Sequence, residues 1–235
     1  MRSAKILWTT AVLAVFVSAP ACAGWPLQTD DAGVLARGEC ELESVAQRVQ
    51  VSGAHGHDTV LQLGCGAGWN TQIAASASTA RADGQRTSCL GVDGKTALWK
   101  AGDSDAAGWT LAWGLTHAKQ AGDSWCQSGN ALNLLMSQPL AAQVTLHANL
   151  GHLREEPLKR SSTTWGLAFE HAGVGAERRW APMGELFGDD REPAWWNLGL
   201  RFTPVAEKFF VHLSYGRQFA PGQPTLLTLG FKAAF

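Results

Sequence analysis

The chain ends in Pro224-Thr-Leu-Leu-Thr-Leu-Gly-Phe-Lys-Ala-Ala-Phe235, where apolar residues alternate with small or polar ones. A β-strand points successive side chains to opposite faces, so residues two apart share a face. One face therefore holds Leu227, Leu229, Phe231, Ala233 and Phe235, and the other holds Thr228, Gly230, Lys232 and Ala234. The stretch is predicted to be a strand with one wholly apolar face.

This stretch resembles the closing strand of bacterial outer-membrane β-barrels, which typically ends on an aromatic residue. The resemblance implies that the apolar face contacts outer-membrane lipid. It also implies that the strand ending at Phe235 is read by the barrel assembly machinery.

The same alternation recurs along the chain, with apolar residues on one face and Gly, Asn, Ser, Thr and a few charges on the other. Strands are predicted near 39–50, 58–68, 71–81, 94–101, 108–118, 129–138, 142–153, 162–171, 174–187, 195–203, 207–217 and 224–235. Most approach the roughly 9–11 residues that a tilted membrane strand needs. We therefore expect an all-β fold, a transmembrane antiparallel up-and-down β-barrel of 12 strands. Ten strands is the alternative, because 71–81 and 94–101 are the weakest.

Composition agrees with a barrel of many short strands. The chain has 26 Gly and 11 Trp, only 17% charged residues, and a net charge of −1. Without a basic stripe, nucleic-acid partners are not expected. Neither a Cys-x-x-Cys motif nor a Cys/His zinc spacing occurs, so we expect no metal and no cofactor.

Residues 1–23 are predicted to be a signal peptide, with Arg2 and Lys5 before an apolar core and Ala21-Cys22-Ala23 as the cleavage site. Residues 24–38 lack alternation and contain Asp30-Asp31. They are predicted to be a periplasmic segment or a plug folded into the barrel. The barrel itself is predicted to span 39–235.

Loop lengths indicate an orientation. The connections expected beside the termini are short: 69–70, 102–107, 139–141, 172–173 and 204–206. Those expected at the other end are longer: 51–57, 82–93, 119–128, 154–161, 188–194 and 218–223. Short periplasmic turns and long outer loops are typical of outer-membrane barrels. We therefore expect a location in the outer membrane of a Gram-negative bacterium, with both termini periplasmic.

Strand parity places several charges in the lumen, and these are the candidate site residues: Glu41, Glu43, Glu170, Glu177, Arg179, Glu185, Arg201 and Lys232. Barrel closure should bring Lys232 near Glu41 or Glu43, and the other five should form one patch. Buried charges must be paired. The set is either a structural salt-bridge network or a selectivity lining for a solute.

The sequence contains further pairs of reactive residues. Cys89 and Cys126 fall in predicted outer loops and are a candidate disulfide, and Cys40 with Cys65 on paired strands is the alternative. His212 and Ser214 share one strand face and resemble the His–Ser pair of outer-membrane lipid hydrolases. Parity directs them into the lumen, away from lipid.

The opening Trp25-Pro-Leu-Gln-Thr-Asp-Asp-Ala-Gly33, together with Glu185-Leu-Phe-Gly-Asp189 and Asn197-Leu-Gly-Leu-Arg201, is similar to the outer-membrane barrels labelled "MetA-pathway of phenol degradation". That resemblance implies a transporter-like barrel for small, hydrophobic or aromatic compounds, without catalytic residues.

The function predicted from the sequence is thus a passive channel or transporter for small molecules, not an enzyme. The alternatives are a sealed structural barrel and a lipid hydrolase using His212 and Ser214.

Overall fold

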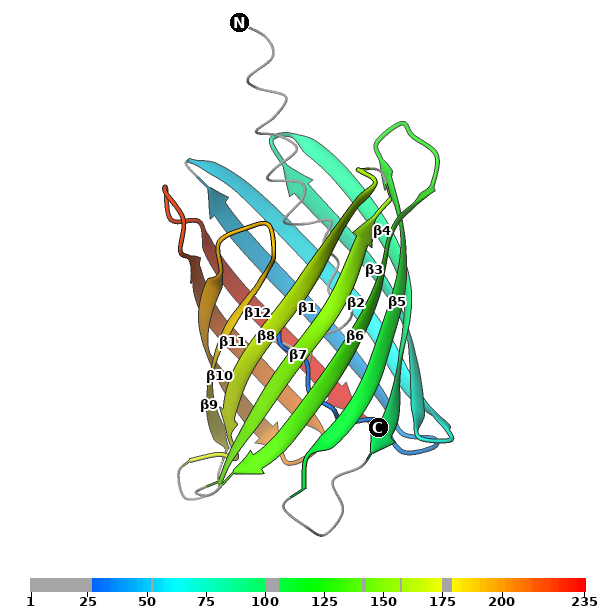
Figure 1. The fold of residues 1–235 in the computed structure, drawn as a ribbon, viewed down its shortest axis with the longest axis vertical. Coiled ribbons are helices and arrows are strands. Elements are labelled where there is room, and N and C mark those ends of the chain that lie inside the picture. Colours follow the sequence, from blue (N-terminus) through cyan, green and yellow to red (C-terminus); the bar gives the residue numbers. More distant parts are fainter. Residues whose placement is uncertain (1–26, 52, 100–105, 141–142, 157, 175–178) are drawn as a thin grey trace, which may run out of the picture.

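The computed structural model describes residues 27–235 except 52, 100–105, 141–142, 157 and 175–178. The predicted signal peptide and Glu177 lie outside these residues. Twelve strands form a closed barrel (Figure 1). They are β1 (Cys40–Val51), β2 (Ala54–Gly68), β3 (Thr71–Ala82), β4 (Gln85–Trp99), β5 (Gly108–Gln120), β6 (Cys126–Leu140), β7 (Val144–Glu155), β8 (Arg160–His171), β9 (Trp180–Asp189), β10 (Trp195–Val205), β11 (Phe209–Gln218) and β12 (Thr225–Ala234).

Each strand pairs antiparallel with its neighbours in the chain, and β1 closes the ring against β12 with Glu43 opposite Lys232. Closure leaves no strand edge unpaired, as a bilayer requires. The all-β barrel of 12 strands is confirmed, and the ten-stranded alternative is wrong.

The two faces of the wall differ as the alternation predicts. On β12, Leu227, Leu229 and Phe231 are exposed on the outside, whereas Thr228 is fully buried inside. The outer face carries many exposed large apolar side chains, including Leu61, Leu63, Leu150, Leu198 and Leu213. In the described part of the chain, no helix is long and apolar enough to cross a membrane.

The predicted outer loop 82–93 is wrong. β4 begins at Gln85 and follows β3 through a turn at Asp83 and Gly84, both of which have positive φ, 49° and 77°. An Asp-Gly pair with two positive φ angles forms the tight hairpin turn that matches strand twist. The apolar pattern missed the start of β4 because its outer face there carries Arg86 and Ser88.

The predicted difference in loop length between the two ends is also wrong. Beside the termini, the connections 69–70, 141–143 and 206–208 are short, but 100–107 and 172–179 are longer than any at the other end, where the longest are 121–125, 190–194 and 219–224. Strands such as β4 and β6 continue past their apolar stretches, so segments expected to be loops are paired strands. Loop length therefore gives no orientation for this barrel.

Candidate functional site

The N-terminal segment, residues 27–38, runs along the inner wall of the barrel. Its first turn is held by Glu185 of β9, whose carboxylate accepts hydrogen bonds from the backbone N–H groups of Gln28 at 2.9 Å and Thr29 at 2.7 Å. The amide of Asn197 on β10 also donates to Glu185, at 2.9 Å. Leu27 packs beside them against Ala168 and Met183.

The middle of the segment is held by side chains of β4 and β7. Lys95 of β4 contacts the carboxylate of Asp30 at 2.6 Å and donates to the carbonyl of Asp31 at 3.3 Å. In the amide orientation that satisfies both ends, Asn149 of β7 accepts from Asp30 N at 2.6 Å and donates to Asp30 O at 2.9 Å. Asp30 is 1% exposed, so its charge needs such a partner.

Further along, the backbone of the segment meets three more strands. Ala32 N–H donates to Ser137 Oγ of β6 at 2.8 Å, and Thr110 Oγ1 of β5 donates to Ala32 O at 2.6 Å. Leu35 N–H donates to Gln72 Oε1 of β3 at 3.1 Å. The anchoring side chains therefore come from β9, β7, β6, β5, β4 and β3, and the segment follows the curvature of the wall.

Two glycines give the segment room. A Cβ at Gly166 of β8 would overlap the side chain of Thr29, and a Cβ at Gly66 of β2 would overlap the carbonyl of Ala36. Only a residue without a side chain lets the backbone of one element approach another so closely. These glycines complete the row of contacts from β9 to β2.

Two groups of luminal charges lie on the part of the wall that the segment leaves open. Lys232 of β12 contacts Glu41 and, at 3.3 Å, Glu43 of β1, as closure of the barrel predicts. Arg201 of β10 pairs with Glu170 of β8.

Of the single patch expected around Arg201, the structure shows one ion pair. Glu170 and Arg201 contact each other, but Glu185 binds the N-terminal segment instead. Arg179 lies exposed before the start of β9, and Glu177 is outside the described residues. The expectation of one patch came from the position of these residues on neighbouring strands. It did not allow for the N-terminal segment, whose backbone N–H groups bind Glu185.

Sequence reasoning missed the residues that hold the segment: Gln72, Lys95, Thr110, Ser137 and Asn149. Most are ordinary polar residues on the luminal face, and alternation predicts only which way they point. Lys95 was detectable, because a charge of luminal parity on a strand needs a partner of opposite charge and the Asp30-Asp31 pair offers one.

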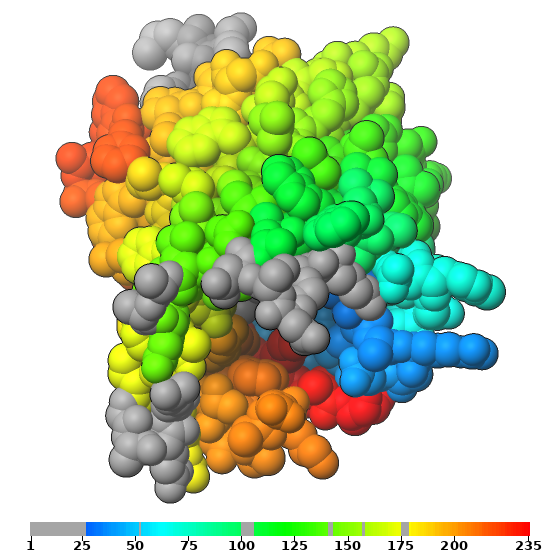
Figure 2. All heavy atoms as spheres, turned by 60° about the horizontal axis from the view of Figure 1, so that its bottom comes forward, coloured from blue at the N-terminus to red at the C-terminus, as the bar shows by residue number. Residues whose placement is uncertain are grey.

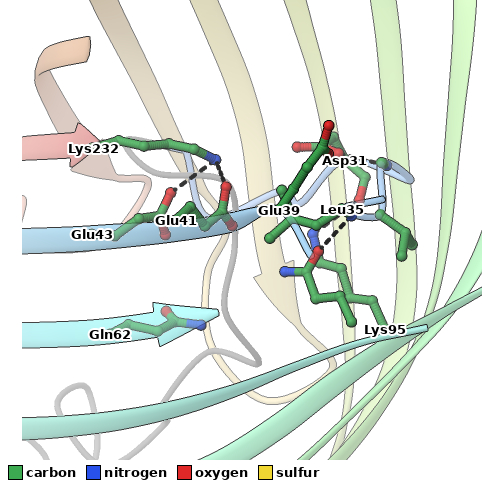
Figure 3. Close-up of a pocket in the computed structure, with 11 residues that line it drawn as sticks. Asp31, Leu35, Glu39, Glu41, Glu43, Gln62, Lys95 and Lys232 are labelled. Atoms are coloured by element: carbon green, nitrogen blue, oxygen red, sulfur yellow. Dashed lines mark hydrogen bonds and ion pairs between the residues drawn. The ribbon is translucent and has the colours of Figure 1, made fainter. Parts of the chain in front are cut away.

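Two cavities lie between the segment and the open part of the wall. The larger, about 270 Å³, is lined by residues of the segment and by Glu41, Glu43, Gln62 and Lys232 (Figure 3). The smaller, about 100 Å³, is lined by Arg201, Phe210 and His212 among others. Both touch Asp31, Glu43 and Lys232, so these three residues mark the place where the cavities adjoin. Figure 2 shows the barrel end nearest the C-terminus hollowed beside the strands coloured orange and red.

Asp31 is the charge that the segment presents to both cavities. Burial raises the pKa of Asp31, but Lys95, Lys232 and His147 act in the opposite direction, so its pKa lies below the ordinary value of 3.8. Gly33 N–H also donates to its carboxylate, at 2.6 Å. Asp31 is therefore ionised at neutral pH.

The His212–Ser214 pair does not have the geometry of a nucleophile and its base. Both residues are 2% exposed inside the barrel, away from the outer face. Neither ring nitrogen of His212 has a hydrogen-bond partner among the described residues, so His212 does not contact the Ser214 hydroxyl. Ser137 Oγ lies 2.8 Å from His147 Nδ1, but the same hydroxyl binds the N-terminal segment.

The candidate disulfide between Cys89 and Cys126 is wrong, because both are free thiols and the bond joins Cys40 to Cys65. Cys89 of β4 and Cys126 of β6 both lie opposite Ala118 of the intervening β5. Two strand spacings, about 9–10 Å, exceed the reach of a disulfide. Cys40 and Cys65 lie directly opposite each other on paired strands, with Cα atoms 4.1 Å apart.

Among the described residues, no group of three or more His, Cys, Asp or Glu side chains has the arrangement of a metal site.

Comparisons with known proteins agree with the architecture. A model of the family described as "Uncharacterised conserved protein UCP029691" matches residues 11–235. No curated protein sequence matches the chain.

The solved structures that it resembles include the COG4313 outer membrane channel from Pseudomonas putida F1, with a TM-score of 0.59 and 12% identity, covering 87% of this chain and 98% of that one. The KdgM porin in complex with disordered oligogalacturonate has a TM-score of 0.58 and 10% identity, covering 82% and 99%. The NanC porin has a TM-score of 0.58 and 10% identity, covering 82% and 98%. At such identities the likeness is one of fold, the fold of outer-membrane barrels.

Proposed function

The chain belongs to the family described as "Uncharacterised conserved protein UCP029691", and we propose that it is a passive outer-membrane channel for small molecules, narrowed by its own N-terminal segment. The observation that carries the proposal is the pair of adjoining cavities between the segment and the wall formed by β1 and β10–β12. The segment fills one side of the lumen and leaves space on the other.

The barrel size supports this proposal. Barrels of about 8 strands are filled by side chains, whereas those of about 16 strands hold an open aqueous channel. A barrel of 12 strands has room for both a docked segment and a narrow passage. The role of residues 27–38 is then that of a partial plug, which sets the width of the passage.

The channel geometry favours polar solutes. The resemblance to barrels labelled for phenol degradation suggests aromatic compounds, but among the residues that line the two cavities Phe210 is the one Phe, Tyr or Trp. Carboxylates, ammonium groups and amides make up most of the remaining lining. The luminal charges pair with one another, and they also face the passage, so the network has both a structural role and a part in selectivity.

The proposal includes a location and an orientation. The apolar outer face suits outer-membrane lipid, and Cys40 N–H and Phe235 N–H each donate to the other residue's carbonyl, at 2.8 and 2.9 Å, where the ring closes. An even number of strands puts the start of β1 and the end of β12 on one side of the membrane. We place them in the periplasm, where assembly machinery would read the strand ending at Phe235.

Conductance measurements test this function. The refolded protein, shown to be folded by heat-modifiable migration in a gel, is inserted into planar lipid bilayers. Small, discrete conductance steps are expected, together with swelling of proteoliposomes in solutions of small polar solutes. A folded barrel without conductance or swelling would favour the sealed structural barrel instead. Release of fatty acid from lipid that Ser214→Ala abolishes would favour the hydrolase.

A further inference from the structure

We propose that the two adjoining cavities form a binding site for a small organic cation, such as a compound with a primary ammonium or guanidinium group. The inference rests on the proposed channel function and names the class of solute that the passage prefers. Three observations support the proposed site: the charge of the residues that line the cavities, the hydrogen-bonding groups there that have no partner, and the position of the cavities on the passage.

The lining of the larger cavity has more carboxylates than cations. Its acidic residues are Asp31, Glu39, Glu41 and Glu43, and its basic residues are Lys95 and Lys232. Both ammonium groups already have partners, since Lys95 contacts Asp30 and Lys232 contacts Glu41 and Glu43. Figure 3 shows Lys232 directed at these two glutamates, while Glu39 and Asp31 lie on the opposite side of the space. The remaining negative charge attracts a cation and repels an anion.

Gln62 adds an unmet acceptor to the same cavity. Its Nε2 donates to Asp93 at 3.4 Å, which fixes the orientation of the amide, because turning it would bring two oxygens together. Its Oε1 then has no donor among the described residues, although Gln62 is only 5% exposed. Buried polar atoms normally have partners, so an acceptor without one beside a cavity is a group that a donor entering the cavity would satisfy.

His212 provides a second unmet group, in the smaller cavity. It is 2% exposed, and neither of its ring nitrogens has a partner among the described residues. A buried imidazolium without a carboxylate partner would be costly, so the ring is neutral and one nitrogen is an acceptor. Phe210 stacks beside it, with ring centroids 6.4 Å apart.

An organic cation fits this set of groups better than other solutes. Ammonium and guanidinium groups carry donors and no acceptors, so they match the carboxylates, Gln62 Oε1 and the acceptor nitrogen of His212. A carboxylate or phosphate would bring further acceptors and negative charge to an acceptor-rich space. A neutral solute would gain hydrogen bonds but no Coulomb attraction.

Two measurements on the refolded full chain test the site. The reversal potential across a bilayer with a KCl gradient reports whether potassium or chloride passes more readily, and potassium is expected to. Calorimetric titration with propylammonium, acetamide and acetate, which have equal numbers of non-hydrogen atoms, reports binding directly. Propylammonium is expected to bind, acetamide more weakly, and acetate not at all.

Glu41→Gln provides the variant, and Glu156→Gln the matched control. Each removes one carboxylate from an ion pair, but Glu41 lines the larger cavity whereas Glu156 pairs with Arg154 at 2.9 Å away from both cavities. Lys232 keeps Glu43 in the first variant. Loss of one nearby charge at an intermediate dielectric should lower both the potassium preference and the propylammonium affinity by roughly threefold to fivefold. Glu156→Gln should change neither.

The outcomes separate this inference from the channel function. A chloride preference, acetate binding as tight as propylammonium binding, or equal effects of the two variants would overturn the cation site while leaving a conducting channel. Absence of conductance in folded protein would overturn the channel function. The titration would then still decide whether the cation site exists.

Discussion

Glu185 uses one carboxylate to hold two backbone amides of the N-terminal segment and the amide of Asn197. In Glu185→Gln one oxygen becomes an NH₂ group, which faces donors and cannot accept from them. Hydrogen bonds to a charged group contribute about 1.5–3 kcal/mol, and docking of the segment should weaken by that order. Hydrogen exchange at the amides of Gln28 and Thr29 should accelerate accordingly. Glu192→Gln, in the exposed connection after β9, should leave exchange unchanged, and equal protection in both variants would contradict this role.

Asp31 makes docking sensitive to acid. Its pKa in the docked segment lies below the ordinary value of 3.8, because Lys95 and Lys232 favour the charged form. A lowered pKa contributes stability at pH values above 3.8 that is lost as the pH falls through the lowered pKa. Exchange of the amides in residues 27–38 should therefore accelerate below pH 3.8. Asp31→Asn should dock more weakly at neutral pH and lose part of this acid response; an acid response identical to that of the wild type would assign it to other carboxyls.

At the scale of elements, the sequence predicts what depends on local alternation. The alternation along β12 predicts that Lys232 points into the lumen, and it contacts Glu41 and Glu43 there. Strand ends are different. β4 begins at Gln85, where Arg86 and Ser88 make the outer face polar and no apolar pattern exists. The start of a strand beyond the apolar band depends on pairing with the adjacent strand, which is not a local property.

The candidate site likewise contains features that local alternation predicts and contacts that it does not predict. The luminal charges follow from parity, but the partners of Glu185 in the N-terminal segment do not, because they are backbone amides more than 150 residues away. A backbone N–H carries no sequence signal of its own. The row of anchors from β9 to β3 therefore became visible only in three dimensions.

The disulfide acts on the pair of strands beside the closure. Cys40 is bonded to Cys65 of β2 and exchanges two backbone hydrogen bonds with Phe235, so it links β2 to the last residue of the chain. A bond that closes a loop of this sequence separation, 25 residues, stabilises by about 3 kcal/mol. Cys40→Ser should lower the free energy of unfolding in urea by that order. Cys126→Ser, which changes an exposed free thiol, should have little effect. An equal decrease in the free energy of unfolding in both variants would show that the disulfide does not stabilise the barrel.

For the whole molecule, the ring of strands and the segment inside it are separable. Each strand is paired along both sides within the ring, so closure does not depend on residues 27–38. Replacing residues 27–38 by a Gly-Ser sequence of equal length removes the Asp30–Lys95 pair and the anchoring of the first turn while keeping the chain length.

That replacement should leave heat-modifiable folding intact and raise the single-channel conductance severalfold, because water and ions would occupy the space that the segment fills. Deletion of the same residues should have the same effect, which separates loss of the contacts from loss of length. Since Asp31 contributes negative charge to both cavities, the wider passage should also prefer potassium less. An unchanged conductance in a folded barrel would mean that ions pass elsewhere, and the plug role of the segment would then be wrong.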